Sequence, residues 1–300
     1  MPNQGFTYGE TLDRRHAGLT VLARLCAFTH STEAQWRERI AAGFVTLEGR
    51  VAHADDILQA GAILAWARPP WEEPEAPLAY AVLHEDEHLL AVAKPSGLPT
   101  LPGADFLEHT LLHLVRQRYP GADPLHRLGR GTSGLVLFAR TEAARRELSK
   151  AWRDHDLLKV YRAWITGHPA VEAFTVDTPI GPIAHPLLGT VHGASPGGRA
   201  SRSEAVVLER RADGTSLVEV TILTGRPHQI RIHMAAAGHP LVGDPLYAPG
   251  GGLLGEGSAL PGDLGYRLHS MRLEGRNPMA EQPFVFHCEP PPILRTGSPS

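Results

Sequence analysis

The order of apolar segments between Leu78 and Leu223 constrains the fold of this chain more than any other feature. Continuous apolar runs alternate with helix-like periodicity in the first part, and two apolar runs follow one another in the last part. The predicted strands are 89–93, 134–139, 159–167, 204–211 and 216–223, and the predicted helices are 107–119 and a segment capped by Thr141. This order predicts an α+β fold with a mixed, largely antiparallel central sheet and flanking helices.

A small α/β unit is predicted before this main domain. Thr32 and Gln35 have the spacing of a capping box ahead of apolar Trp36 and Ile40, and segment 44–52 alternates like a hairpin. The predicted organisation is a poorly ordered tail at 1–16, the small unit at 17–68, a proline- and acid-rich linker at 69–77, the main domain at 78–290 with a loop-like stretch at 179–198, and a second tail at 291–300.

Composition limits the classes of function. A formal net charge of −3 over 300 residues argues against a uniformly basic nucleic-acid binder but allows a local basic cleft. No apolar run reaches the roughly 18 residues of a membrane span, the N-terminus lacks a signal-peptide pattern, and Cys26 and Cys288 suggest no disulfide framework, so we expect a cytoplasmic protein. Of 29 basic residues only Lys94, Lys150 and Lys159 are lysines, which suggests that these positions need a compact ammonium group.

Three segments concentrate polar residues where predicted strands meet loops. They are HRLGRGTSG at 126–134, KVYRA at 159–163 and TGRPHQIRIH at 224–233. The first lacks the Gly-Lys-Ser/Thr ending of a P-loop, and its Ser133 does not lie in a Gly-x-Ser-x-Gly elbow. Its glycines precede a strand, whereas a dinucleotide-binding fingerprint follows a strand and opens a helix.

The histidines and the arginines of these segments suggest different roles. His228, His233 and His239 match no common metal-ligand spacing, so we expect packing or hydrogen-bonding roles for them. Arginines at strand ends suit phosphate contacts and base stacking, and a tyrosine in the same cleft can pack on a flipped-out nucleotide. Each residue alone is compatible with surface charge or core packing. Together the set favours a nucleic-acid cleft: Arg127, Arg226, Arg231 and Tyr161.

In this order, the three segments resemble the signature blocks of the RluA-type family of RNA pseudouridine synthases. The family's blocks read His-Arg-Leu-Asp-x-x-Thr-Ser-Gly, Lys-x-Tyr-x-Ala and Thr-Gly-Arg-x-His-Gln-Ile-Arg-x-His. The resemblance covers about 78–290 and includes the turn AKPSGLP around Lys94, GHPLVGDPLY, and RLHSMRL around His269. The N-terminal unit is similar to the small S4-type RNA-binding module.

The resemblance implies an enzyme that isomerises a uridine of structured ribosomal or transfer RNA to pseudouridine in a nucleotide-binding cleft, with no metal or cofactor. We also expect the protein to be a monomer. The family depends on an aspartate whose position is Gly129 in this chain. By the same resemblance Tyr161 packs against the base, and Arg231 is the salt-bridge partner of the aspartate. The RNA-binding residues that it implies are Arg127, which would help displace the flipped uridine, together with Arg226, Lys94, Lys159, His126 and Thr132.

The glycine at position 129 leaves three hypotheses open. The first is an active synthase that uses another acid, and the candidates are Asp123, Asp154, Asp156 and Asp244. The second is a catalytically silent RNA-binding pseudoenzyme, in which the backbone N–H groups around Gly129 and Gly131 cradle phosphate. The third is a protein-interaction scaffold, against which the intact arginine set argues. With no aspartate at 129, Arg231 must be solvated, bound to phosphate or paired with another acid.

Overall fold

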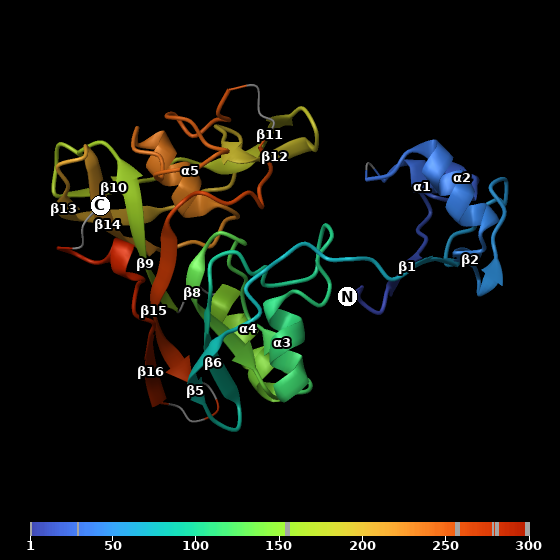
Figure 1. Ribbon diagram of the computed structural model, residues 1–300, viewed down its shortest axis with the longest axis horizontal. Coiled ribbons are helices and arrows are strands. Elements are labelled where there is room, and N and C mark those ends of the chain that lie inside the picture. The colour runs from blue at the N-terminus through green and yellow to red at the C-terminus, as the bar shows by residue number, and fades with distance from the viewer. Residues whose placement is uncertain are drawn as a thin grey trace. The chain divides into compact units, whose positions relative to one another are not determined.

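The computed structural model describes residues 2–28, 30–153, 157–255, 259–277, 279 and 282–297. The chain divides into two compact units, Met1–Glu73 and Pro74–Ser300, and the division falls inside the stretch expected to be a linker. Figure 1 colours the smaller unit blue and the larger unit from cyan to red. None of the helices that the structure describes has the length and apolar character of a bilayer-spanning segment.

The N-terminal unit combines two helices with a sheet of strand order β1-β4-β2-β3. Its elements are β1 (Phe6–Thr11), α1 (Val21–Cys26), α2 (Glu33–Ala41), β2 (Val45–Leu47), β3 (Arg50–Val51) and β4 (Ile63–Arg68). The predicted capping box is confirmed, because Thr32 Oγ1 accepts from the Gln35 backbone N–H while the Gln35 side chain accepts from that of Thr32. The hairpin is confirmed as well: Glu48 and Gly49 have φ of 52° and 77°, which suits a primed two-residue turn.

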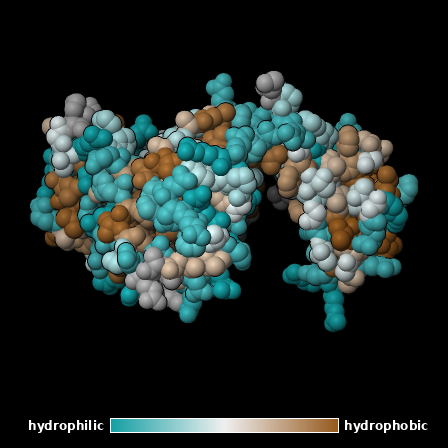
Figure 2. Space-filling view, turned by 90° about the horizontal axis from the view of Figure 1, so that it is seen from below, coloured by the Kyte–Doolittle hydropathy of each residue, from teal (hydrophilic) through white to brown (hydrophobic). Residues whose placement is uncertain are grey.

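Buried side chains from both helices and from the sheet form the core of this unit. Trp36 and Ile40 of α2 pack with Val21 of α1 and with Val45 and Leu64 of the sheet. On the face viewed in Figure 2, apolar side chains lie among polar ones on both units. Such scattered exposed apolar groups are normal for a folded protein.

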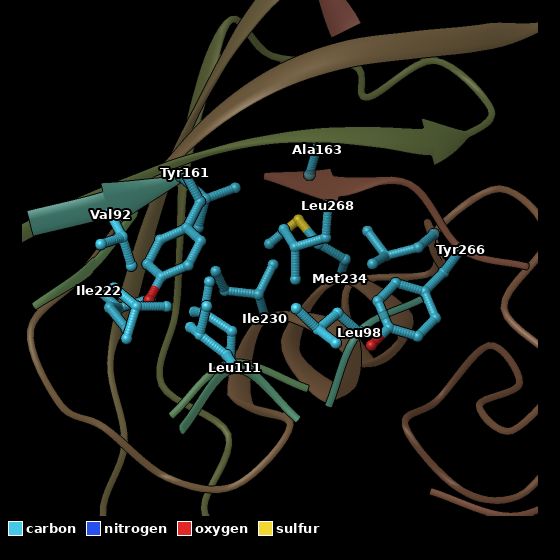
Figure 3. Packing of buried hydrophobic residues seen from close by; sticks show 14 of the residues in the cluster. Val92, Leu98, Leu111, Tyr161, Ala163, Ile222, Ile230, Met234, Tyr266 and Leu268 are labelled. Atoms are coloured by element: carbon cyan, nitrogen blue, oxygen red, sulfur yellow. The ribbon is translucent and has the colours of Figure 1, made fainter. Parts of the chain in front are cut away.

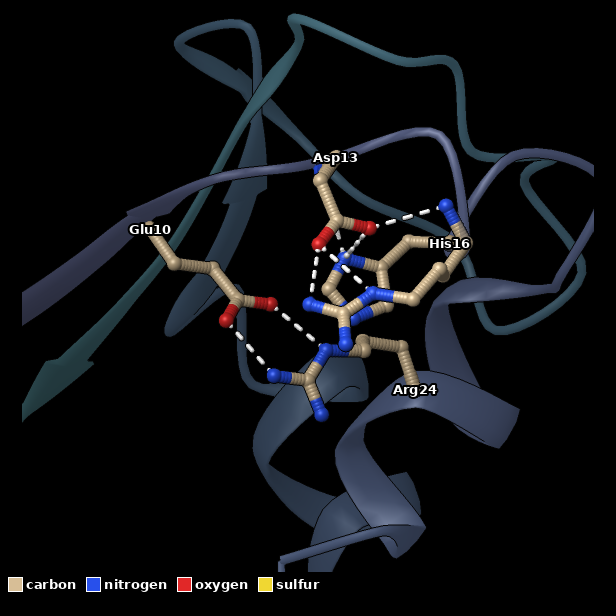
Figure 4. Close-up of polar contacts among 5 residues, drawn as sticks. Glu10, Asp13, His16 and Arg24 are labelled. Atoms are coloured by element: carbon tan, nitrogen blue, oxygen red, sulfur yellow. Dashed lines mark hydrogen bonds and ion pairs between the residues drawn. The ribbon is translucent and has the colours of Figure 1, made fainter.

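The prediction of a poorly ordered tail at 1–16 is wrong for Phe6–Thr11, which form β1. This strand pairs antiparallel with β4 along its whole length. The Tyr8 ring stacks on Trp66 with centroids 5.4 Å apart, and Glu10 accepts two hydrogen bonds from Arg24 of α1 at 2.7 and 2.6 Å (Figure 4). The polar sequence of 6–11 does not predict a strand. The segment is ordered because its backbone pairs with β4, which lies more than fifty residues away in the sequence.

The larger unit is built on a ten-stranded sheet with the strand order β10-β13-β14-β9-β15-β8-β6-β5, to which β16 adds beside β15 and β7 beside β8 (Figure 1). Its strands are β5 (Ala81–Glu85), β6 (Leu89–Lys94), β7 (Asp123–Pro124), β8 (Ser133–Ala139), β9 (Leu158–Thr166), β10 (Ala173–Val176), β13 (Ser203–Arg210), β14 (Thr215–Ile222), β15 (Leu268–Asn277) and β16 (Gln282–His287). The β8–β15 pair is parallel and the other pairs of this sheet are antiparallel. The predicted mixed, largely antiparallel sheet is confirmed.

Both faces of the central strands are buried, which explains their continuous apolar runs. On β6, Leu90 and Val92 join one core cluster, whereas Leu89 and Ala91 join another. Helix α3 (Leu111–Arg118) contributes to the first cluster and α4 (Glu142–Arg153) to the second. A third helix, α5 (Gln229–Ala236), follows β14 and is buried along most of its length.

Two further predictions are wrong. The stretch 179–198 is not loop-like, because β11 (Ile180–His185) and β12 (Gly189–Ala194) form an antiparallel hairpin there. Three of its glycines, Gly181, Gly193 and Gly198, allow close packing: a Cβ on Gly198, for example, would lie 2.4 Å from the carbonyl carbon of Ile180. The C-terminal segment is also ordered as far as it is described: η1 (Pro292–Leu294) buries Leu294, and the Arg211 guanidinium donates to the carbonyls of Ile293 and Arg295.

Candidate functional site

A pocket in the larger unit brings the three polar segments together. Its walls come from the loop before β8, from β9, from the start of α5 and from the segment leading into β15. These elements meet because β9 lies between β14 and β15, while β15 pairs with the first residues of β8. The lining residues are Arg127, Leu128, Gly129, Thr132, Tyr161, Ile222, Arg226, His228, Gln229, Ile230, Arg231, Tyr266 and Leu268.

The loop 126–134 ends at a point where only glycine fits. Gly134 has φ of 108°, and a Cβ on it would lie 2.2 Å from the carbonyl oxygen of Ser270. This close approach lets β8 and β15 pair in parallel where the loop ends and β8 begins. Ser133 Oγ also lies 2.9 Å from Nδ1 of His269, a buried ring whose Nε2 is 3.0 Å from the Cys288 carbonyl. The loop therefore has a fixed end on the sheet.

The turn that follows β6 holds the middle of this loop. Ser96 Oγ donates to the Gly131 carbonyl at 2.7 Å, the Gly97 N–H donates to the Arg130 carbonyl at 2.8 Å, and Thr100 Oγ1 donates to the Leu128 carbonyl at 2.9 Å. Lys94 Nζ donates to three carbonyls, those of Pro95, Leu98 and Arg130. The turn and the loop thus form one hydrogen-bonded assembly, which we call the loop brace (residues 94–100 against 128–131).

Lys94 and Lys159, which the resemblance implies as RNA-binding residues, are both buried in the structure. Lys94 is 2% exposed and its ammonium faces the loop brace; burial lowers its pKa to about 7. Lys159 is 4% exposed and its ammonium lies 5.2 Å from the centroid of the Trp152 ring. Neither side chain offers a surface on which RNA phosphate can lie. The scarcity of lysine therefore marked structural positions in these two cases.

His126 also has a structural environment. Its ring stacks on Trp152 with centroids 4.4 Å apart, and its Nε2 accepts from the Leu137 N–H at 3.0 Å. Burial lowers the pKa of His126 to about 3, and the nearby Lys159 adds to this effect. The ring therefore stays neutral and anchors the start of the loop, and the expectation that it binds RNA is not supported by its position.

Gly129 and Gly131 lie against the ring of Tyr266. A Cβ on Gly129 would be 2.9 Å from Tyr266 Oη, and one on Gly131 would be 2.8 Å from Tyr266 Cζ. Neither glycine has a positive φ, so space alone decides the residue type. Thr132 Oγ1 lies 3.3 Å from Tyr266 Oη, and both groups are buried. The ring of Tyr266 thus fills the side of the loop to which a residue-129 side chain would point.

Arg231 is paired with Asp244. Its Nε and Nη2 donate to the two carboxylate oxygens, each at 2.7 Å, and the side chains are 2% and 0% exposed. Burial alone would lower the pKa of Arg231, but the bidentate carboxylate outweighs it, so that the pKa is raised. Of the three states open to Arg231, the structure shows pairing with another acid.

The substitute acids can be placed in part. Asp244 accepts from Arg231 and from the backbone N–H groups of Leu246 and Tyr247, and it does not line the pocket. Asp123 pairs at the surface with Arg116. Asp154 and Asp156 lie outside the described residues. No aspartate or glutamate is present among the residues that line the pocket.

Tyr161 projects from β9 into the wall of the pocket. It is 8% exposed, and burial raises its pKa to about 12, against the opposing effect of the neighbouring Ser270 hydroxyl. Figure 3 shows Tyr161 and Tyr266 at opposite ends of a cluster of apolar side chains that includes Ile230 and Leu268. The pocket lining thus combines two tyrosines with four apolar side chains, those of Leu128, Ile222, Ile230 and Leu268.

The arginines and histidines of the three segments differ in exposure and in their hydrogen-bond partners. Arg127 is exposed, whereas Arg226 is half-buried and donates to the Ala200 carbonyl at 3.2 and 3.1 Å. His228 lines the pocket, and its Nδ1 lies 2.8 Å from Tyr247 Oη, which donates to the His192 carbonyl. His233 and His239 hydrogen-bond to Ser203 and to the Thr166 carbonyl, so the hydrogen-bonding roles predicted for all three histidines are confirmed.

Sequence reasoning missed Tyr266. It lies three residues before His269, next to a segment that carries the resemblance, and only its contact with Gly129 and Gly131 distinguishes it from other aromatic residues. Asp244 was one of four candidate acids, and no spacing rule joined it to Arg231.

Comparisons with known proteins agree with this geometry. The RNA pseudouridylate synthase family matches residues 88–236. An uncharacterised RNA pseudouridine synthase of Synechocystis is 45% identical over 90% of this chain and 93% of its own length. RNA pseudouridine synthase 5 of Arabidopsis thaliana is 34% identical over 98% of this chain and 95% of its own length. The dual-specificity RNA pseudouridine synthase RluA of Yersinia pestis is 35% identical over 69% of this chain and 98% of its own.

A solved structure shows the same fold. Human RNA Pseudouridylate Synthase Domain Containing 1 superimposes with a TM-score of 0.56 and 26% identity, covering 74% of this chain and 88% of that one. Sequence, fold and the three assembled segments lead to one conclusion: the chain belongs to the RluA-type family of RNA pseudouridine synthases, which are isomerases that act on RNA.

Proposed function

We propose that this chain converts a uridine of structured ribosomal or transfer RNA to pseudouridine in the pocket lined by Arg127, Tyr161 and Arg226, with glycine at position 129. The observation that supports the proposal is the assembly of the three polar segments around one pocket whose lining includes apolar side chains, two tyrosines and the arginines Arg127 and Arg226. Apolar and aromatic side chains suit an unstacked base, and arginines suit the phosphates that flank it.

In this proposal the side chains have separate roles. Arg127, exposed at the rim, fills the place that the flipped uridine leaves and contacts its phosphate. The neutral Tyr161 phenol packs on the uracil and assists removal of the C5 proton. Thr132 stabilises the wall of the pocket through its contact with Tyr266, and the half-buried Arg226 contacts a phosphate of the RNA. Arg231, already paired with Asp244, is a fixed positive charge behind the ribose.

The test is pseudouridine-specific chemical mapping of ribosomal and transfer RNA from cells with and without this gene. We expect at least one uridine that is modified only when the gene is present, and whose modification returns when the gene is restored. The purified chain should make the same modification in RNA from the deletion cells. RNA that is bound but not modified would contradict the proposal and would indicate the RNA-binding pseudoenzyme instead.

A matched pair of arginine variants connects the activity to the pocket. Arg127→Ala should lower kcat/KM by about ten- to a hundredfold, because it removes one or two charge-assisted contacts of about 1.5–3 kcal/mol in total. Arg145→Ala is the control, since Arg145 lies on α4, pairs with Glu142 and is absent from the pocket lining. Equal losses in the two variants would mean that general positive charge, not the pocket, binds the RNA.

The proposal extends to the location of the enzyme, its oligomeric state and the role of its N-terminal unit. We expect a cytoplasmic monomer, and we expect its N-terminal unit, with its resemblance to S4-type modules, to add RNA affinity. Binding of RNA from deletion cells by the full chain, compared with that by residues 74–300, tests this contribution provided that the shorter chain retains its thermal unfolding transition.

A further inference from the structure

The phenol of Tyr266 occupies the position from which the family aspartate would act. Its Oη would be 2.9 Å from a Cβ at position 129, and its Cζ would be 2.8 Å from a Cβ at position 131. A carboxylate on residue 129 and the present Tyr266 ring therefore cannot coexist without a shift of one of them. The Tyr266 ring in its present position therefore depends on the absence of side chains at Gly129 and Gly131.

Tyr266 also has the partners that the missing carboxylate would need. The guanidinium carbon of Arg231 lies 4.2 Å from the centroid of its ring, while Thr132 Oγ1 lies 3.3 Å from its Oη. A cation held over an aromatic ring attracts negative charge that develops on that ring. Because Asp244 fixes Arg231 in place, this positive charge does not have to move during a reaction.

The other titratable groups at the pocket are not suited to act in place of the family aspartate. A guanidinium group has no lone pair to act as a nucleophile or a base, which excludes the three arginines of the pocket lining. His228 must donate its Nδ1–H to Tyr247 Oη, because that hydroxyl donates to the His192 carbonyl, and burial lowers the pKa of His228 to about 3. Tyr161 stands at the far end of the apolar cluster from Tyr266. Two hydroxyl groups of the pocket lining lie beside Gly129: Tyr266 Oη and Thr132 Oγ1 would be 2.9 and 3.7 Å from a Cβ at that position. Tyr266 is the nearer of the two, and a phenol releases its proton and leaves a sugar carbon far more readily than an aliphatic alcohol does.

We infer that Tyr266 is the catalytic residue that replaces the family aspartate at the ribose of the target uridine. The inference rests on the proposed function and deepens it. The Tyr266 oxygen attacks C1′ as the C1′–N1 bond breaks, and its proton goes to N1 of the departing uracil. Tyrosine is an established type of nucleophile at the anomeric carbon of sugars.

The second half of the reaction regenerates the phenol. The neutral uracil turns so that C5 faces C1′, the C5–C1′ bond forms, and the C1′–O bond to Tyr266 breaks with its electron pair returning to the oxygen. The C5 proton is then lost to the Tyr266 oxygen, which restores the Tyr266 hydroxyl. The net change is uridine to pseudouridine with N1 protonated, and no oxidant, reductant or external base is consumed.

Four variants test this inference by pseudouridine mapping on total RNA from cells that lack the gene. Tyr266→Phe keeps the ring under Arg231 and removes only the hydroxyl, and should lower the rate at least about a hundredfold. Tyr247→Phe is the control, because Tyr247 also lies under Arg231, at 5.0 Å, but does not line the pocket. Gly129→Asp alone should not raise activity, since Tyr266 fills its space. Gly129→Asp combined with Tyr266→Leu should recover activity lost in Tyr266→Phe.

The outcomes separate the inference from the proposed function. Each variant is first checked for its thermal unfolding midpoint and for retention of RNA on a filter. If the wild-type chain makes pseudouridine and Tyr266→Phe makes it equally fast, the inference fails and the proposed function stands. If the wild-type chain makes none, both fail. A further positive sign is mass spectrometry that finds a nucleotide on the peptide bearing Tyr266 after reaction with 5-fluorouracil-substituted RNA, whereas a nucleotide on another residue would overturn the inference.

Discussion

At the scale of single residues, Arg231 illustrates how one side chain serves structure and site together. Its guanidinium is 2% exposed, paired in bidentate fashion with Asp244, and stacked between the rings of Tyr247 and Tyr266. A charge buried in this way is tolerated only because its partner is buried beside it. Asp244 therefore stabilises the arginine against which the pocket is built, although the carboxylate does not reach the pocket.

The corresponding prediction concerns Asp244→Asn. We expect this change to reduce the free energy of unfolding by about 3–5 kcal/mol, because it leaves the Arg231 charge buried without a counter-ion. Asp123→Asn, at the surface pair with Arg116, should cost no more than about 1 kcal/mol. Urea denaturation of both variants measures the difference. Similar losses would show that Arg231 gains enough solvent or backbone partners to do without the carboxylate.

At the scale of elements, the site depends on two segments that bind no substrate in the proposal. The loop brace fixes residues 128–131 through side chains of the turn after β6, and the parallel β8–β15 pairing fixes the end of the same loop at Gly134. Without these hydrogen bonds a glycine-rich loop could adopt many conformations. The hydrogen-bond donors of the turn stabilise one conformation by pairing with the loop's carbonyl groups.

Lys94→Met tests the loop brace. It leaves the carbonyls of Pro95, Leu98 and Arg130 without the ammonium donor, so we expect a loss of about 1–3 kcal/mol in the free energy of unfolding and a larger proportional loss of activity. Lys150→Met, at an exposed position of α4, should change stability by no more than about 0.5 kcal/mol. A fully stable and active Lys94→Met variant would show that the turn and the loop hold without this residue.

At the scale of the whole molecule, packing of the larger unit opposes protonation of three histidines, of which His269 is buried and His126 and His228 are half-buried. Burial lowers the pKa of His126 and of His228 to about 3 and that of His269 to about 4. Each ring also accepts or donates hydrogen bonds in its neutral form. These histidines link the first polar loop, the start of α5 and the pairing of β15, so their protonation would disturb the site and the sheet together.

The sign of the pH dependence follows from these lowered values. The unfolded chain takes up protons on its histidines near pH 6.5, whereas the folded chain resists protonation until about pH 3–4. Their contribution to stability is therefore complete above pH 6.5 and is lost as the pH falls. Each should add up to about 1.4 kcal/mol per pH unit to the slope. Urea denaturation between pH 7.5 and 4.5 measures it, and His126→Gln should make the slope shallower. A flat profile would contradict the burial of these rings.

The sequence by itself determined the fold class and the identity of the three polar segments. Apolar runs at β6, β8 and β9 predict strands because both faces of those strands are buried, and the capping box at Thr32 is a local signal. Arg127, Tyr161 and Arg226 could be expected at one site because the ordered segments resemble those of a known family. Strand β1 was missed because its polar sequence is ordered by pairing with the distant β4. The β11–β12 hairpin was missed because its sequence is rich in glycine, and the buried Leu294 because its order depends on tertiary packing.

Only the tertiary structure decided what surrounds Gly129. The sequence marks the absence of a carboxylate there, but a glycine carries no information about what fills the space beside it. Tyr266 is more than a hundred residues away, and Asp244 reaches Arg231 from a separate loop. Contacts of this kind depend on how β8, β9 and β15 lie next to one another, a matter of three-dimensional packing that no local pattern encodes. The position without a side chain is thus explained by the aromatic ring that lies against it.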